Sequence, residues 1–264
     1  MGTVDISIFA LSLAFLLLIV PMVMSYYFGL NMIKPMLYST ARMSIQLFLV
    51  GIFLKYLFEY NNPYLNILWF FIMITSAVFT VVKSSSLKAG KVIFPVLISF
   101  TAATFCVLFF INFFVIDLDN VFDARYLIVL GGMLLGNSLR GNIVGVGTFY
   151  SNIRKDNKRF LYTLSLGATH YEAVIPYLRE SLELALKPTI AAMATMGIIA
   201  LPGMMTGVIL GGADPETAIK YQIMIMLAIL VSTLLSVLLT ILMTLKICFN
   251  RYGVLKQDVF TVKK

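Results

Sequence analysis

Long, uninterrupted apolar runs constrain the fold of this 264-residue chain more than any other feature of its sequence. A helix crosses the hydrocarbon of a bilayer with roughly 20 apolar residues, and seven segments approach that length. They are residues 6–27, 42–57, 64–82, 92–115, 126–148, 188–210 and 221–247. The runs are continuous, whereas the strands of a membrane barrel alternate apolar and polar residues. The sequence therefore predicts one all-α transmembrane domain over residues 1–264: a polytopic membrane helical bundle of about seven transmembrane helices with a cytoplasmic elbow.

The composition excludes the main soluble classes. Hydrophobic residues make up 60% of the chain and charged residues only 12%, and the mean hydropathy is +0.95. Soluble domains average about 45–50% apolar and about 25% charged residues. With so much to bury, the chain is not disordered, and Cys106 and Cys248 alone do not make a disulfide scaffold. We expect the lipid bilayer as its surroundings and no nucleic acid as a partner, although the net charge is +8.

The distribution of that charge predicts the orientation in the membrane. With seven spans and the N-terminus outside, most of the 20 Lys and Arg residues lie in inner regions, and the outer regions hold only Lys55, Arg125 and Lys220. Positive loops stay on the cytoplasmic side. The N-terminus carries Asp5 in place of a basic region, so it does not resemble a cleavable signal. The sequence predicts a multi-pass protein of the plasma (cytoplasmic) membrane with the N-terminus outside and Lys264 in the cytoplasm.

Residues 152–187 form the one long polar connection, and they predict a sharp corner between two helices. A helix over 160–166, including Leu164, ends before Gly167, and glycine accepts the positive φ that often follows a helix. After Ala168, Thr169 and Glu172 stand at the positions of a capping box. The next helix has an apolar face, which consists of Tyr171, Val174, Ile175, Leu178, Leu182 and Leu186. We expect Pro176 to kink this helix or to begin a new one.

Two interpretations of this corner remain open at this point. The helix could lie on the inner leaflet as an amphipathic segment, or the corner could be a docking elbow for a cytoplasmic partner. The corner resembles the coupling loop of ABC transporter permeases in its glycine and in the helix that follows. Leu161-Tyr162-Thr163 stands where those permeases carry Glu-Ala-Ala.

Four further stretches, in the same order and spacing, resemble the FetB family of iron-export ABC permeases, which includes plant relatives linked to aluminium tolerance. They are GMLLGNS at 132–138, LSLGAT at 164–169, LPGMMTG at 201–207 and AIKYQIM at 218–224. The resemblance implies a permease subunit that exports iron or another metal ion or metal complex. It also implies a cytoplasmic ABC ATPase subunit as partner, which would dock at Leu164, Gly167, Ala168, Thr169 and Glu172.

The chain itself carries no nucleotide-binding motif. Gly90-Lys91 lacks both the upstream Gly and the following Ser or Thr of a Walker A sequence. We therefore expect a transmembrane subunit that is not itself an enzyme, with no catalytic residues and no bound cofactor. ATP and Mg²⁺ would be held by the partner ATPase. A second copy of the permease, giving a homodimer, is expected because seven spans do not easily enclose a pathway.

The sixth predicted span, 188–210, carries the features of a translocation pathway. Pro202, beside Gly203, is expected to kink the helix and leave a carbonyl without its helical donor. Gly203 and Gly207 form a small-residue face that permits close helix packing. That face indicates either plain tight packing or a broken helix that lines a pathway, since irregular backbone within a membrane is tolerated beside a cavity.

Side chains near that kink predict the lining of the pathway. Met204 and Met205 flank it, and Asn137 in the fifth span is a polar group too short to reach the interface. Arg140, in the same span, is long enough to extend to the inner interface. Methionine thioethers, including those of Met193 and Met196, suit soft metals but are also ordinary apolar filler. The sequence therefore leaves the metal ligands unassigned, and His170 is interpreted as the first residue of a capped helix.

A stand-alone seven-helix secondary transporter, or another polytopic membrane protein that is not driven by ATP, is the alternative. Secondary transporters often show internal repeats and buried ionisable residues. Neither is evident here. A retinal-type pump would need a lysine in the middle of the last span, which Lys220 and Lys246 only bracket.

Overall fold

The computed structural model describes residues 6–85, 87–199, 201–250 and 252–256, so the predicted outer tail with Asp5 and the predicted cytoplasmic end at Lys264 lie outside the described residues. The described chain is helical apart from turns, loops and isolated bridge residues, which include the pair Phe249 and Leu255. Its elements are α1 (Ile8–Ala14), η1 (Phe15–Leu18), α2 (Ile19–Tyr27), α3 (Ile33–Tyr60), α4 (Pro63–Ser84), α5 (Ala89–Phe110), η2 (Ile111–Val115), α6 (Ala124–Lys155), α7 (Asn157–Ser165), α8 (His170–Thr195), α9 (Gly203–Leu210) and α10 (Pro215–Cys248).

Six helical stretches are long and apolar enough to cross a membrane, and this confirms the polytopic helical bundle. They are Ile8–Tyr27, Ile33–Tyr60, Pro63–Ser84, Gly90–Val115, Ala124–Lys155 and Pro215–Cys248. The second stretch is longer than the predicted span 42–57, because its polar start from Lys34 to Gln46 is also helical. The chain is therefore a multi-pass membrane protein.

The predicted span 188–210 differs from the others, because it is divided between two helices. Helix α8 continues through Pro176 and Pro188, so the predicted kink at Pro176 does not end or restart it. It ends at Thr195, after which Met196 is extended and Gly197 has a φ of +84°. Pro202 is the N-cap of α9. Residues 188–210 are therefore shared between the end of α8 and the short α9, and neither helix is among the six long apolar stretches.

Helices α6 and α10 are parallel neighbours, and a ladder of buried polar side chains joins them. Ser138 hydrogen-bonds Ser232, Asn142 donates to Ser236, and Tyr150 donates to Thr244. Each pair is 94 residues apart in sequence, so the two helices keep one register along the whole ladder.

Close packing accompanies this ladder and explains two of the glycines in α6. A Cβ atom built on Gly145 would lie 2.6 Å from Val237 Cγ1 in α10 and 3.3 Å from Ala185 Cβ in α8. At Gly141 it would overlap with Thr233. Small residues that let helices approach this closely are typical of membrane bundles.

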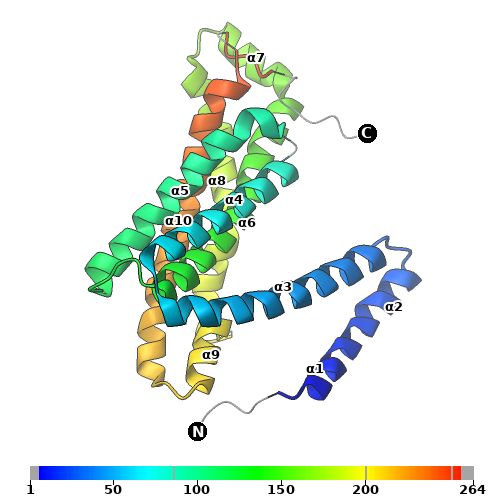
Figure 1. Cartoon of the computed structure of the whole chain (residues 1–264). Helices are drawn as coiled ribbons and strands as arrows, with labels where there is room; N and C mark the ends of the chain where they lie inside the picture. The colour runs from blue at the N-terminus through cyan, green and yellow to red at the C-terminus, as the bar shows by residue number, and fades with distance from the viewer. Residues whose placement is uncertain (1–5, 86, 200, 251, 257–264) are drawn as a thin grey trace.

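The bundle has two distinct ends, with α7 at one and α9 at the other (Figure 1). Helix α6 has 32 residues, which corresponds to a length of about 48 Å and exceeds the hydrocarbon thickness of about 30 Å. Part of α6 therefore extends beyond the hydrocarbon, and Arg154 and Lys155 in its last turn favour the end that leads to the α7–α8 corner.

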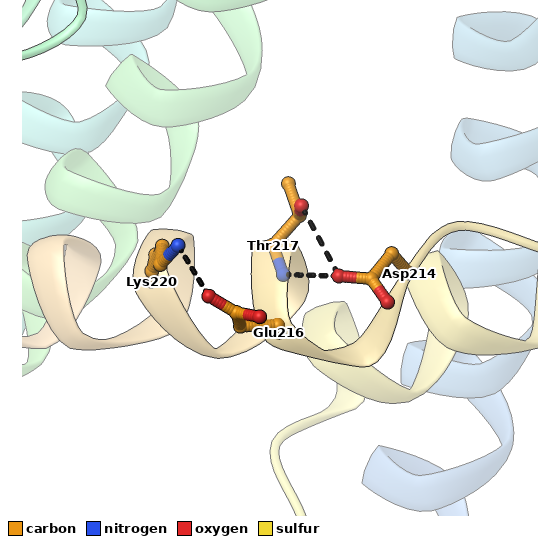
Figure 2. Close-up of polar contacts among 4 residues, drawn as sticks. All are labelled: Asp214, Glu216, Thr217 and Lys220. Carbon is orange, nitrogen blue, oxygen red and sulfur yellow. Dashed lines mark hydrogen bonds and ion pairs between the residues drawn. The ribbon is translucent and has the colours of Figure 1, made fainter.

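Capping residues define where the helices begin at the α9 end. Figure 2 shows the start of α10, where Asp214 accepts a hydrogen bond from the Thr217 amide at 3.1 Å and Glu216 pairs with Lys220 at 2.6 Å. Asn61, at the end of α3, donates to Asp123, the N-cap of α6, at 2.7 Å. The Asn61–Asp123 contact ties the end of α3 to the start of α6.

Candidate functional site

The corner between α7 and α8 has the local structure that its sequence predicts. Gly167 adopts a φ of +90°. Thr169 caps α8, since its hydroxyl oxygen accepts from the Glu172 amide at 3.3 Å, and Glu172 Oε2 accepts from the Thr169 amide at 2.8 Å. These donors lower the pKa of Glu172, so the carboxylate of the capping box stays ionised at neutral pH.

Aromatic packing holds the inner side of this corner. The His170 ring stacks edge-on against Phe249 at a centroid distance of 4.7 Å and lies 6.3 Å from Phe160. Phe249 belongs to the turn that follows α10 and bridges back to Leu255. Burial lowers the pKa of His170. His170 is the first residue of α8 after the Thr169 cap, so the structure fits the interpretation of His170 as a capped-helix residue.

The outer side of the corner exposes large side chains. Tyr162, Leu166 and Tyr171 all have most of their surface accessible. Tyr171 was predicted on the apolar face of the second helix, but the buried face of α8 consists of Ala173, Val174, Leu178, Ser181 and Ala185. Tyr171 is 62% exposed, so it does not belong to this buried face. The corner therefore presents apolar surface to a partner or to lipid.

A cavity of about 560 Å³ lies between α6, α8, α9 and α10. It brings together four of the predicted pathway residues: Asn137, Pro202, Gly203 and Met204. The remaining lining consists of Met133, Arg140, Gly141, Val144, Ala185, Pro188, Thr189, Ala192, Met196, Gln222, Met226 and Ile229. Residues distant in sequence thus meet at the break between α8 and α9.

A second cavity of about 490 Å³ adjoins the first. Met205 lines it together with Met193, and the two cavities share Met196, Gln222 and Met226. Gly207 lines neither cavity.

Gln222 is the lining residue that sequence reasoning missed. Its side chain is buried, its Nε2 donates to Met196 Sδ at 3.6 Å, and its Oε1 has no hydrogen-bond partner. The sequence did contain a clue, because Gln222 is the one amide side chain in the apolar run of the last predicted span. A polar side chain within a membrane is energetically costly and often has a functional role.

Two expectations about the break are wrong in detail. Pro202 lies at the start of α9, so it does not kink a continuous helix, and its own carbonyl accepts from the Thr206 amide at 2.9 Å and from the Thr206 hydroxyl at 3.1 Å. Gly203 and Gly207 do not mediate close packing between described residues, because a Cβ on either would meet nothing within 4 Å. The tight glycine contacts are instead those of α6. Proline predicted a break correctly, but it acts as a cap there.

Apart from Arg140, the side chains that line the two cavities are neutral. Asn137 donates to the Met133 carbonyl within its own helix at 2.8 Å, which leaves its carbonyl oxygen available. None of the described residues lining either cavity is Asp, Glu, His or Cys. Across the described residues, no group of three such side chains could hold a metal ion. The arrangement suits passage or weak binding better than covalent chemistry.

A multi-pass helical bundle with a helix break beside a partly polar cavity is typical of membrane permeases. The comparisons agree: the chain belongs to the family described as "Uncharacterised protein family (UPF0014)", whose model matches residues 8–249. The resemblance to FetB is thereby confirmed.

Three relatives illustrate the family. The probable iron export permease protein FetB of Escherichia coli (strain K12) is 34% identical over 220 residues, which cover 82% of each chain. Protein ALUMINUM SENSITIVE 3 of Arabidopsis thaliana is 30% identical over 81% of this chain and 77% of its own. The UPF0014 membrane protein YjkA of Bacillus subtilis (strain 168) is 29% identical over 82% of this chain and 85% of its own. No solved structure matches the chain significantly.

Proposed function

We propose that this chain is the permease subunit of an ABC transporter that exports a metal ion or metal complex. A separate cytoplasmic subunit would bind and hydrolyse ATP with Mg²⁺. Iron is the metal in the name of the E. coli relative, and we propose it as the first metal to test. The observation that carries the proposal is that a single helix, α8, begins at the capped corner and ends at the cavity.

The length and packing of α8 suit it to transmit force. Its 26 residues correspond to about 39 Å of helix. The first turn holds the capping box, whereas Ala185, Pro188, Thr189 and Ala192 near its other end line the larger cavity. A continuous helix moves as a stiff element, so displacement of the corner by a partner would shift one wall of the cavity.

The corner supplies a docking surface for the ATPase. Gly167 and the Thr169–Glu172 capping box fix its shape, and Leu164 and Ala168 lie beside them. The exposed Leu166 at the tip gives apolar area that a partner could bury. If the corner is an amphipathic segment, the same surface would lie on lipid instead. Measuring whether the ATPase binds the corner therefore distinguishes these two interpretations.

The pathway would run through the cavity at the α8–α9 break. Asn137, Pro202, Gly203 and Met204 line it, and Met205 and Gly207 lie on the adjoining short helix. A second copy of the permease would complete the route on the side that this chain leaves open. The proposed orientation places the α7 end in the cytoplasm of the plasma membrane and the N-terminus outside. A reporter fused after Lys264 should therefore be active only in the cytoplasm.

Co-reconstitution tests the proposal. The chain and its candidate ATPase would be purified together and placed in proteoliposomes, with ATP hydrolysis and iron efflux measured side by side. Gly167→Val should lose co-purification and stimulated hydrolysis, because valine rarely adopts a φ near +90°. Gly147→Val is the matched control, since Gly147 is helical with nothing within 4 Å of an added Cβ. Metal transport by the chain without any ATPase would instead support a stand-alone secondary transporter.

A further inference from the structure

We propose that the two adjoining cavities form one binding site for a soft metal cation of low charge, held by methionine thioethers and the amide oxygen of Gln222. The site would select Cu⁺ most strongly and would favour ferrous over ferric iron. This inference rests on the proposed function, because it names the chemical class of the ion that the pathway accepts.

Methionines converge on this place from separate parts of the chain. Six of the chain's 15 methionines line the two cavities, and they are Met133, Met193, Met196, Met204, Met205 and Met226. They come from α6, from α8 and the break that follows it, from α9 and from α10. Core packing alone does not require several methionines to cluster around a cavity. Thioethers that do so supply the soft ligands that Cu⁺ prefers.

Gln222 points independently to a ligand. Its side chain is 5% exposed, and its Oε1 is buried without a hydrogen-bond partner. Its Nε2 donates a hydrogen bond to Met196 Sδ at 3.6 Å, and Gln222 lines both cavities. A buried acceptor that lacks a donor is costly, and a cation between the thioethers would satisfy it.

The charge of the lining selects against highly charged ions. The described lining residues include no carboxylate, imidazole or thiol. A hard trivalent ion such as Fe³⁺ needs anionic oxygen ligands to replace its water shell, and none is present. Arg140 lines the larger cavity and adds a positive charge, which repels each added charge on the ion. A monovalent soft ion meets the smallest repulsion and the best-matched ligands.

Silver ion is the probe, because Ag⁺ has the softness and charge of Cu⁺ without its redox chemistry. Calorimetric titration of the full-length chain in detergent should show Ag⁺ binding, whereas ferric citrate should not bind. Met196→Leu, Met226→Leu and Gln222→Leu should each weaken Ag⁺ binding about tenfold or more, the scale on which losing one metal-site interaction acts. Met→Leu nearly conserves volume, so these variants should fold.

Met43→Leu is the matched control, because Met43 lies exposed on α3 away from both cavities. It should bind Ag⁺ like the unaltered chain, and thermal unfolding of every variant confirms folding. The assignment would be overturned by any of three results. These are that the chain does not bind Ag⁺, that Met43→Leu weakens Ag⁺ binding as much as Met196→Leu does, or that ferric citrate binds more tightly than Ag⁺.

Iron efflux measured on the same samples separates this inference from the proposed function. If ATP-driven efflux persists in a chain that binds no Ag⁺, the soft-metal site is wrong and the transporter assignment stands. If Ag⁺ binds at Gln222 and the methionines but no ATPase drives export, the site stands and the proposed function is wrong.

Discussion

The N-terminal arm, α1 to α3, and the bundle, α4 to α10, contain candidate membrane spans of similar mean hydropathy but pack very differently. In residues 6–60 only Ser25 and Leu57 are buried. The most apolar window of α3 is 6% buried, against 50% for α6 and α10. Figure 1 shows α1 and α2 as one limb and α3 as the other limb of an arm that diverges from the bundle.

The difference lies in which residues interrupt the apolar runs. In α10, the polar Ser232, Ser236 and Thr244 are all buried against α6. In α3, Arg42 and Gln46 interrupt the run in a similar way but remain exposed. Hydropathy places both regions in the membrane, whereas small residues and matched polar pairs determine which helices of the chain pack together.

The largest expected effect is that of a side chain at Gly145. Gly145→Val should cost about 1–3 kcal/mol or more of unfolding free energy, because its Cβ would overlap Val237 and press on Ala185. Gly147→Val in the same helix and Gly51→Val in the arm should change stability by about 0.5 kcal/mol or less, since an added Cβ meets nothing within 4 Å at either position. Thermal unfolding in detergent measures all three. Equal destabilisation by Gly51→Val would show that the arm packs as tightly as the bundle.

The polar ladder should give a smaller effect. Asn142→Ala removes the hydrogen bond to Ser236, and a double-mutant cycle with Ser236→Ala should give a coupling energy of about 0.6–1.7 kcal/mol. Gln46→Ala in α3 should leave stability unchanged, because Gln46 is exposed. A coupling energy near zero would mean that the ladder sets register without contributing to stability.

The sequence predicted those features that depend on local chemistry. Apolar runs identified the crossings, and Gly167 with Thr169 and Glu172 identified the corner, because capping and positive φ involve neighbouring residues. The contacts of Gly145 with α10 were not predictable, because nothing local distinguishes it from Gly147. The residues that line the cavity at the α8–α9 break were predicted in part, and Gln222 was missed because what distinguishes it is an unpaired buried oxygen. The exposure of the arm could not be predicted from the sequence either, because hydropathy does not distinguish a surface that faces lipid from one that packs against another helix.

Helix caps offer a more local test of the difference between the N-terminal arm and the bundle. Thr169→Ala should destabilise the first turn of α8 by about 0.5–2 kcal/mol, seen as faster amide hydrogen exchange at residues 170–173. Ser7 caps α1 in the arm, where its side chain accepts from the Ala10 amide at 3.2 Å. Ser7→Ala should speed exchange in α1 alone, because few contacts transmit the change. Faster exchange in the bundle upon Ser7→Ala would contradict the separation of the two regions.

The smallest expected effect is a pH dependence confined to the corner. Burial lowers the pKa of His170, and its Nε2 is buried without a hydrogen-bond partner. The folded corner therefore favours the neutral ring, whereas the unfolded chain binds a proton at its ordinary pKa of about 6.5. The stabilisation is complete above that value and is lost as the pH falls through it towards the lower folded pKa.

Amide exchange across α7 and the first turn of α8 should accordingly quicken as the pH falls below about 6.5, after correction for the intrinsic exchange rate, while α1 to α3 stay unchanged. Glu172 does not account for this change, because Thr169 lowers the pKa of its carboxyl group and keeps it ionised over the same interval. His170→Phe preserves an aromatic ring against Phe160 and Phe249 without a titrating group, so it should abolish the pH dependence. If the corner of His170→Phe loosened in the same interval, another group would be responsible. If α1 to α3 loosened with it, the arm and the bundle would be coupled more closely than their packing indicates.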